Sequence, residues 1–144
     1  MARILIVGCG CRGQALTREL VAAGHTVRGT TRDPARTHDI HEAGAEPYVG
    51  DPDRIGTLMG ALTGVTVLVW LMGSATGDAD DVFALHDGRL RMLWEKLVDT
   101  PVRGVVYEGP SEDTARRFAD TFRVRLEVLG DGDDPAAAVT RVLA

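Results

Sequence analysis

A glycine-rich stretch near the amino terminus, Gly8-Cys-Gly-Cys-Arg-Gly13, has the spacing of a phosphate-binding turn. It follows a short apolar run at residues 3–7 and precedes an amphipathic stretch at residues 14–23. Gly8 would make the tight turn, Gly10 would let a pyrophosphate approach the backbone, and Gly13 would let a helix pack closely on a strand. The helix N-terminus would offer unpaired N–H groups and partial positive charge to the phosphates. The motif predicts a dinucleotide site; a glycine-rich turn without a ligand is the alternative.

Both cysteines of the chain, Cys9 and Cys11, lie within this turn. Two cysteines are too few for a disulfide framework or a self-contained zinc site. Either they are small fillers beside the ligand, or they are redox sensors, because a helix N-terminus favours the thiolate.

Other reactive side chains form weaker patterns. His38 and His41 are three residues apart on a short expected helix, a spacing that suits a metal, but no third ligand is placed near them and a solvated helix face is the simpler interpretation. The acidic residues Asp78, Asp80 and Asp81 lack the dense ligand register of a Ca²⁺ loop. The sequence therefore predicts no metal site.

The elements that must position the glycine turn follow from the hydrophobic pattern. Apolar or alternating segments that indicate strands alternate six times with helical segments, which predicts a parallel sheet with helices on both faces. The best expectation is an α/β, doubly wound sheet of order 3-2-1-4-5-6, with the ligand cleft outside strands 1 and 4. The expected strands are residues 3–7, 25–31, 45–50, 65–72, 102–107 and 124–129, and the expected helices are residues 14–23, 33–43, 54–62, 81–99, 111–122 and 135–143.

Length and composition bound the possible functions. At 144 residues and 44% apolar content, residues 1–144 are expected to form one globular domain. The net charge of −5 argues against nucleic acid and anionic membranes as main partners. No apolar run approaches the roughly 20 residues of a membrane span, and the amino terminus lacks a signal-peptide layout. A cytoplasmic protein is the expectation.

Three segments carry a resemblance to a known family: Ile4–Gly13, Ala23–Pro34 and Gly44–Asp51. In them the sequence resembles the short-chain dehydrogenase/reductase superfamily, most closely its NAD-dependent epimerase/dehydratase and NmrA-like branches. The similarity covers about the first 73 residues well and the next 35 loosely. It implies a Rossmann fold that binds NADP or NAD. The cofactor-binding positions that it implies are Gly8, Gly10, Cys11, Arg12, Gly13, Thr31, Arg32, Arg36, Asp51, Leu71, Met72 and Gly73.

The end of the second expected strand favours NADP. NAD-preferring members of the superfamily have an acidic residue there, where this chain has Thr31 followed by Arg32. An arginine can pair bidentately with a 2′-phosphate, and the loss of the carboxylate removes repulsion. Arg36 and Arg12 could join the same pocket. Two alternatives stay open: a slip of one residue would make Asp33 the acidic residue, and Arg32 could be a solvated loop cation.

Two further positions follow from the resemblance. Asp51 matches a family aspartate near the adenine, although it could equally cap a helix that opens at Pro52. Leu71, Met72 and Gly73 fall where the family lines the cofactor after the fourth strand.

The catalytic pair of the superfamily is absent. Members use Tyr-x-x-x-Lys, in which the lysine lowers the tyrosine pKa for acid/base work. Here neither Tyr48 nor Tyr107 has a lysine four residues on, and Lys96, the only lysine, follows Met92 by four.

Three functions remain open. The first is a dinucleotide sensor or regulator, as the resemblance to NmrA-like proteins implies. The second is an NAD(P)-dependent oxidoreductase or epimerase/dehydratase-like enzyme with an unusual acid, for which Glu108, Tyr107 and Ser74 are the candidates. The third is a chain that works only with a partner chain. A homodimer is also expected, because the segment 81–99 is apolar over more than one face.

Overall fold

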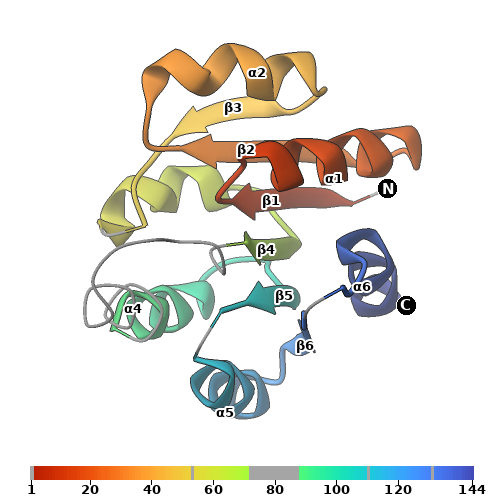
Figure 1. Cartoon of the computed structure of the whole chain (residues 1–144). Helices are drawn as coiled ribbons and strands as arrows, with labels where there is room; N and C mark the ends of the chain where they lie inside the picture. Colours follow the sequence, from red (N-terminus) through yellow and green to blue (C-terminus); the bar gives the residue numbers. More distant parts are fainter. Residues whose placement is uncertain (1, 53, 72–87, 110, 131) are drawn as a thin grey trace.

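A six-stranded parallel sheet forms the centre of the molecule (Figure 1). The computed structural model describes residues 2–52, 54–71, 88–109, 111–130 and 132–144. The strand order is β3-β2-β1-β4-β5-β6, which confirms the predicted doubly wound topology. The strands are β1 (Arg3–Val7), β2 (Thr26–Thr31), β3 (Glu46–Val49), β4 (Val67–Leu71), β5 (Gly104–Glu108) and β6 (Arg125–Val128).

Helices cover both faces of this sheet, and each face has its own apolar core. On one face α1, α2 and α6 pack over residues such as Ile6 and Val69. On the other face η2, α4 and α5 pack over residues such as Leu5 and Trp70. The helices are α1 (Cys11–Ala22), η1 (Pro34–Arg36), α2 (Thr37–Glu42), η2 (Ile55–Leu62), α4 (Gly88–Leu97), α5 (Glu112–Phe122) and α6 (Pro135–Leu143).

The fourth strand is central, as its apolar run predicted. Every residue of β4 is buried, because helices cover it from both faces. The outer strands differ from it. β3 is an edge strand, a position in which Pro47 is tolerated, and β6 is half-exposed.

Several helices depart from the expected boundaries. The first helix begins at Cys11 rather than Gln14, since the Gln14 N–H already donates to the Gly10 carbonyl at 2.8 Å. The segment expected as one helix from Asp33 is split into the short 3₁₀ turn η1 and α2. Of the helix expected over 81–99, the structure describes Gly88–Leu97, and residues 81–87 lie outside the described residues.

The expected helix at 54–62 is a 3₁₀ helix, η2. Gly56 and Gly60 weaken an α-helix within so short a segment. Gly60 also packs so closely on the Tyr48 hydroxyl that a side chain there would collide with it. The N-cap position of η2 is Arg54, so the expectation that Asp51 caps this helix is wrong.

Because all six strands are parallel, the sheet has one side formed by the carboxyl ends of the strands and another formed by their amino ends. The carboxyl ends of all six strands lie on one side, and the glycine turn follows β1 on that side. The two chain termini lie on the other side, beside the amino ends of the strands (Figure 1). Any site built on the glycine turn therefore faces away from both termini.

Candidate functional site

The three glycines of the turn occupy three different environments. Gly8 has φ +87°, a left-handed conformation that favours glycine. A Cβ atom on Gly13 would lie 3.3 Å from the Gly8 carbonyl oxygen and from Ile6 Cγ2, so α1 packs closely on β1. A Cβ atom on Gly10 would meet nothing within 4 Å. The turn thus leaves open space beside Gly10, where a pyrophosphate would need to approach.

Backbone hydrogen bonds hold the turn against the end of β2. The Cys9 N–H donates to the Thr30 carbonyl at 3.1 Å, and the Gly8 N–H donates to Thr30 Oγ1 at 3.3 Å. The first N–H groups of α1 have no partner within the helix and point toward the carboxyl edge of the sheet. The residues present therefore fit a bound phosphate group. Thr30 was not among the expected site residues, because nothing in its sequence context marks it as a support.

The two cysteines differ in environment. Cys9 is buried, and its Sγ atom lies between α1 and β2, 4.0 Å from Thr17 Oγ1. Burial raises the pKa of the Cys9 thiol. This geometry favours the role of a small filler for Cys9. Cys11 is exposed in the first turn of α1.

The end of β2 presents arginine side chains at the carboxyl ends of the strands. The strand ends at Thr31, and Arg32 is exposed, with no ion pair among the residues that the structure describes. Asp33 follows, and its carboxylate accepts a hydrogen bond from the Ala35 N–H at 2.9 Å, which caps η1. The same carboxylate lies 4.0 Å from Arg36 Nε. Asp33 is thus engaged locally, whereas Arg32 is not.

Arg12 lies elsewhere than expected. Its guanidinium binds the carboxylate of Glu108 at the end of β5 through both terminal nitrogens, with Nη1 2.6 Å from Oε1. Hydrogen bonding to Glu108 raises the pKa of the Arg12 guanidinium. Since β5 and β2 lie on opposite sides of β1, this arrangement places the Arg12 guanidinium away from Arg32 and Arg36. The expectation that Arg12 joins these two arginines is therefore wrong for this structure.

With this geometry in view, the sequence was compared with known protein families. A sequence model described as NAD(P)H-binding matches residues 8–106, from the glycine turn into β5. The chain belongs to this NAD(P)H-binding family. A search of curated proteins gave no match.

Solved structures extend this assignment to the predicted superfamily. A short-chain dehydrogenase/reductase superfamily protein from Agrobacterium tumefaciens with bound NAD is 28% identical, with 74% of this chain and 32% of that chain covered and a TM-score of 0.60. The protein gox2253 is 27% identical, with 75% and 34% covered and a TM-score of 0.64. The resemblance to this superfamily is thereby confirmed. The chain spans about a third of the length of these two structures.

A more distant structure shares the fold. Triphenylmethane reductase from Citrobacter sp., solved with NADP(H), is 15% identical, with 88% of this chain and 48% of that chain covered and a TM-score of 0.66. At this identity the likeness concerns the fold alone.

Two other expected cofactor positions lie at the same edge of this NAD(P)H-binding domain. Leu71 is the last residue of β4. Asp51 follows β3, and its N–H donates to Thr57 Oγ1 at 2.8 Å. Met72 and Gly73, and the candidate acid Ser74, lie outside the described residues.

Tyr107 is placed as a structural residue. Tyr107 is fully buried in the core beneath α4 and α5, and its hydroxyl accepts a hydrogen bond from the Ser111 N–H at 2.9 Å. A buried phenol cannot meet a substrate, which removes the ground for Tyr107 as an acid. Ser111 holds the N-cap position of α5, but its side chain makes no capping bond.

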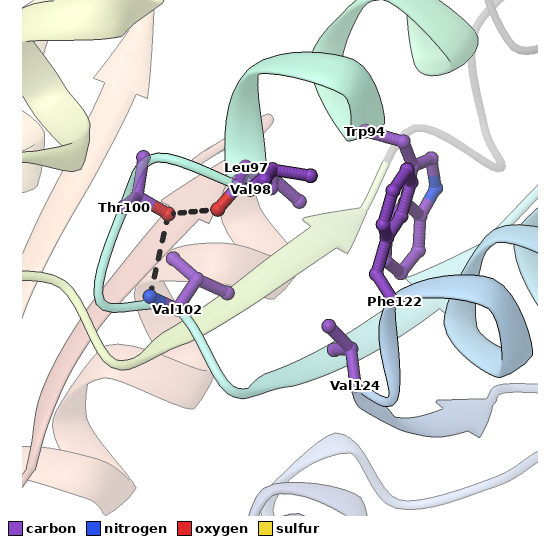
Figure 2. A pocket seen from close by; sticks show the side chains of 7 residues that line it. All are labelled: Trp94, Leu97, Val98, Thr100, Val102, Phe122 and Val124. Atoms are coloured by element: carbon purple, nitrogen blue, oxygen red, sulfur yellow. Dashed lines mark hydrogen bonds between the residues drawn. The ribbon is translucent and has the colours of Figure 1, made fainter.

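A small pocket, lined mostly by apolar residues, lies on the side of the amino ends of the strands, between the end of α4 and the turns that lead into β5 and β6 (Figure 2). Trp94, which is buried in the core, forms part of its wall and stacks on Phe118 with ring centroids 6.2 Å apart. The pocket is separate from the glycine turn. Its lining residues are Trp94, Leu97, Val98, Thr100, Val102, Phe122 and Val124.

The weaker sequence patterns give no site in the described part of the chain. His38 and His41 are both exposed on α2, and His38 lies 3.7 Å from Glu42. No group of three potential metal ligands occurs among the described residues. The acidic residues Asp78, Asp80 and Asp81 lie outside them. Among the described helices, none combines the length and the apolar character that crossing a bilayer requires.

Proposed function

We propose that this NAD(P)H-binding domain is a dinucleotide sensor or regulatory module that prefers NADP(H). The observation that carries the preference is Arg32, an exposed cation directly after β2 with no ion pair in the described part of the chain. A 2′-phosphate on the adenosine ribose would be bound there by a charge-assisted hydrogen bond.

The position of Asp33 supports the same choice. In an NAD-preferring site a carboxylate accepts hydrogen bonds from the ribose hydroxyls. The Asp33 carboxylate already caps η1 through Ala35 and lies near Arg36. The Thr31 hydroxyl is also bound within this loop, to the Asp33 N–H and carbonyl. Asp33 is therefore partly engaged in its own loop, and Arg32 is the charged side chain there that stays available to a ligand.

The regulatory assignment rests on the acid/base residues. The chain lacks Tyr-x-x-x-Lys, Tyr107 is buried, and Glu108 is bound to Arg12. A dinucleotide site in which, among the described candidates, neither Tyr107 nor Glu108 is a free proton donor suits a protein that reports which nucleotide is bound. A cytoplasmic location and a single domain over residues 1–144 stay predictions.

A titration of the chain with NADP, NADPH, NAD and NADH tests the proposal. We expect NADP(H) to bind about ten- to a hundredfold more tightly than NAD(H), because one charge-assisted contact is worth about 1.5–3 kcal/mol. Arg32→Ala should remove this ratio. Arg54→Ala, which removes another exposed arginine, is the matched control and should preserve it. Equal affinities in the wild-type chain would contradict the NADP preference.

An enzyme is the second candidate, and Glu108 carries it. Glu108 lies at the carboxyl end of β5, where a carboxylic acid could face the nicotinamide half of a bound cofactor. In that case the cofactor would supply the hydride and the protein an unusual acid. NADPH oxidation with a panel of carbonyl compounds separates the two functions: turnover that Glu108→Gln abolishes would favour the enzyme, and binding without turnover favours the sensor.

A further inference from the structure

The Arg12–Glu108 ion pair joins two elements that the sheet keeps apart. Arg12 comes from the first turn of α1, directly after β1, and Glu108 is the last residue of β5. Strand β4 lies between β1 and β5, and its last residue, Leu71, is the register partner of Glu108. The ion pair therefore bridges the two strands that flank β4 at the carboxyl edge of the sheet.

The two side chains of this pair differ in exposure. The Glu108 side chain is 14% exposed and the Arg12 side chain is 52% exposed. A carboxylate that is largely withdrawn from water requires its counter-charge, whereas an exposed guanidinium can be hydrated. Glu108 is thus the fixed member of the pair, and its need for a counter-charge keeps the Arg12 guanidinium beside it.

The held guanidinium keeps donors to spare. An arginine has five N–H donors in a fixed fork, and the two bonds to Glu108 use two of them. The remaining donors can bind a second anion without breaking the ion pair. The backbone of Arg12 lies in the first turn of α1, where a pyrophosphate would bind.

We propose that Glu108 is a positioning residue for the dinucleotide: it holds Arg12 at the pyrophosphate and nicotinamide half of the cleft. This inference rests on the dinucleotide binding proposed above. It assigns Arg12 and Arg32 to opposite halves of one ligand. Glu108 and the end of β2 are three strand spacings apart, about 14 Å at roughly 4.8 Å per strand, too far for both arginines to share one phosphate.

Titrations of the full chain with NADP, NAD and adenosine 2′-monophosphate test this assignment. Glu108→Gln should weaken NADP and NAD by the same factor, about tenfold, because both carry the pyrophosphate and a charge-assisted contact is lost. Adenosine 2′-monophosphate has no pyrophosphate, so its affinity should not change. Arg12→Lys, which keeps the charge but loses the fork, should give the same pattern at an exposed position where folding is not at risk.

A double-mutant cycle tests whether Glu108 acts through Arg12. In an Arg12→Ala background, Glu108→Gln should cause no further loss of NADP affinity. Glu127→Gln is the matched control, because it breaks the Glu127–Arg141 ion pair between β6 and α6 and should leave all three ligands unaffected.

The outcomes separate this inference from the proposed function. Wild-type chain that binds no dinucleotide would overturn both. Wild-type binding that Glu108→Gln leaves unchanged or tightens would overturn only the positioning role, and tighter binding would mean that Glu108 withholds Arg12 from the ligand. Loss of adenosine 2′-monophosphate binding in the same variant would also overturn it, since the damage would then not be confined to the pyrophosphate half.

Discussion

The Sγ atom of Cys9 lies 2.7 Å from the point where a Cβ atom on Gly29 would stand. The buried thiol and the glycine thus form one close contact between the glycine turn and β2. The same Sγ atom lies 3.2 Å from a Cβ placed on Gly13, so Cys9 fills the space that two glycines leave. The glycine turn after β1 is therefore fixed by the packing of Cys9 against β2 and α1 as well as by hydrogen bonds to Thr30.

This contact predicts that Gly29→Ala destabilises the fold. The added methyl group would collide with both Sγ and Cβ of Cys9, and overpacking of this kind costs about 1–3 kcal/mol. Gly56→Ala is the control, because a Cβ there meets nothing within 4 Å. Urea unfolding of both variants measures the difference in the free energy of unfolding. Equal midpoints would mean that the turn can shift to make room for the methyl group.

Gly10→Val should abolish dinucleotide binding and leave the fold intact. The side chain would enter the open space beside the turn, where the pyrophosphate must approach, and it would touch no protein atom at its Cβ. Calorimetric titration with NADP measures binding, and a thermal melt checks the fold. Binding retained by a folded variant would mean that the glycine turn is only structural.

The thiols should differ in reactivity. Burial raises the pKa of Cys9, so its thiol stays protonated and shielded at neutral pH, whereas Cys11 is exposed. We expect iodoacetamide to label the folded chain once, at Cys11, and the Cys11→Ser variant not at all; peptide mass spectrometry reads this out. A labelled Cys9 in the folded chain would contradict its placement in the core.

The same pKa direction has a consequence for stability. The folded chain holds the Cys9 proton more tightly than the unfolded chain does, so this contribution is fully present below the ordinary thiol pKa of about 8.5 and is lost as the pH rises further. The free energy of unfolding should therefore fall more steeply above that pH in the wild-type chain than in Cys9→Ala. The same pH dependence of the free energy of unfolding in both chains would contradict this prediction.

Tyr107→Phe should cost stability without loss of ligand binding. The hydroxyl accepts the buried Ser111 N–H, and an unsatisfied buried donor costs about 1–3 kcal/mol. Tyr48→Phe is the control, and its effect should stay within about 0.5 kcal/mol. Urea unfolding gives the stabilities. A lower NADP affinity of the folded Tyr107→Phe variant would show that Tyr107 contributes to ligand binding.

Association of two chains through α4 stays a prediction, and the structure limits the apolar residues available for it. Leu93, Trp94 and Leu97 turn into the core, whereas Met92 and Val98 are 46% and 56% exposed. Light scattering coupled to size exclusion at micromolar concentration should give the mass of two chains. Val98→Asp should return it to one, while the control Leu143→Asp, on α6, should not. A single-chain mass for the wild type would leave α4 as an ordinary cover of the sheet.

The sequence predicted features that depend on neighbouring residues, but not contacts between residues that are far apart in the chain. The strand order and the three glycine environments follow from local patterns and from chain-connection rules, and the structure agrees with them. The contact between Arg12 and Glu108 joins residues 96 positions apart, and neither residue carries a local sign of the other. The sequence therefore indicated a pocket of three arginines, whereas the structure divides them between two sides of β1.

Burial and helix type were also beyond local patterns. Tyr107 lies next to the end of β5, where a site residue and a core residue look alike in sequence, and only packing by α4 and α5 distinguishes the two. The segment at 55–62 has helical apolar spacing but forms a 3₁₀ helix, in which Gly60 packs closely on the Tyr48 hydroxyl of β3. Such outcomes depend on tertiary contacts between segments that are distant in the sequence.

The placement of both termini beside the amino ends of the strands has a practical consequence (Figure 1). A fusion protein, affinity tag or surface linker attached at either end would lie across the sheet from the glycine turn. The domain could therefore be immobilised through either end on a sensor chip, or joined to a fluorescent reporter, while its nucleotide cleft stays open to solvent.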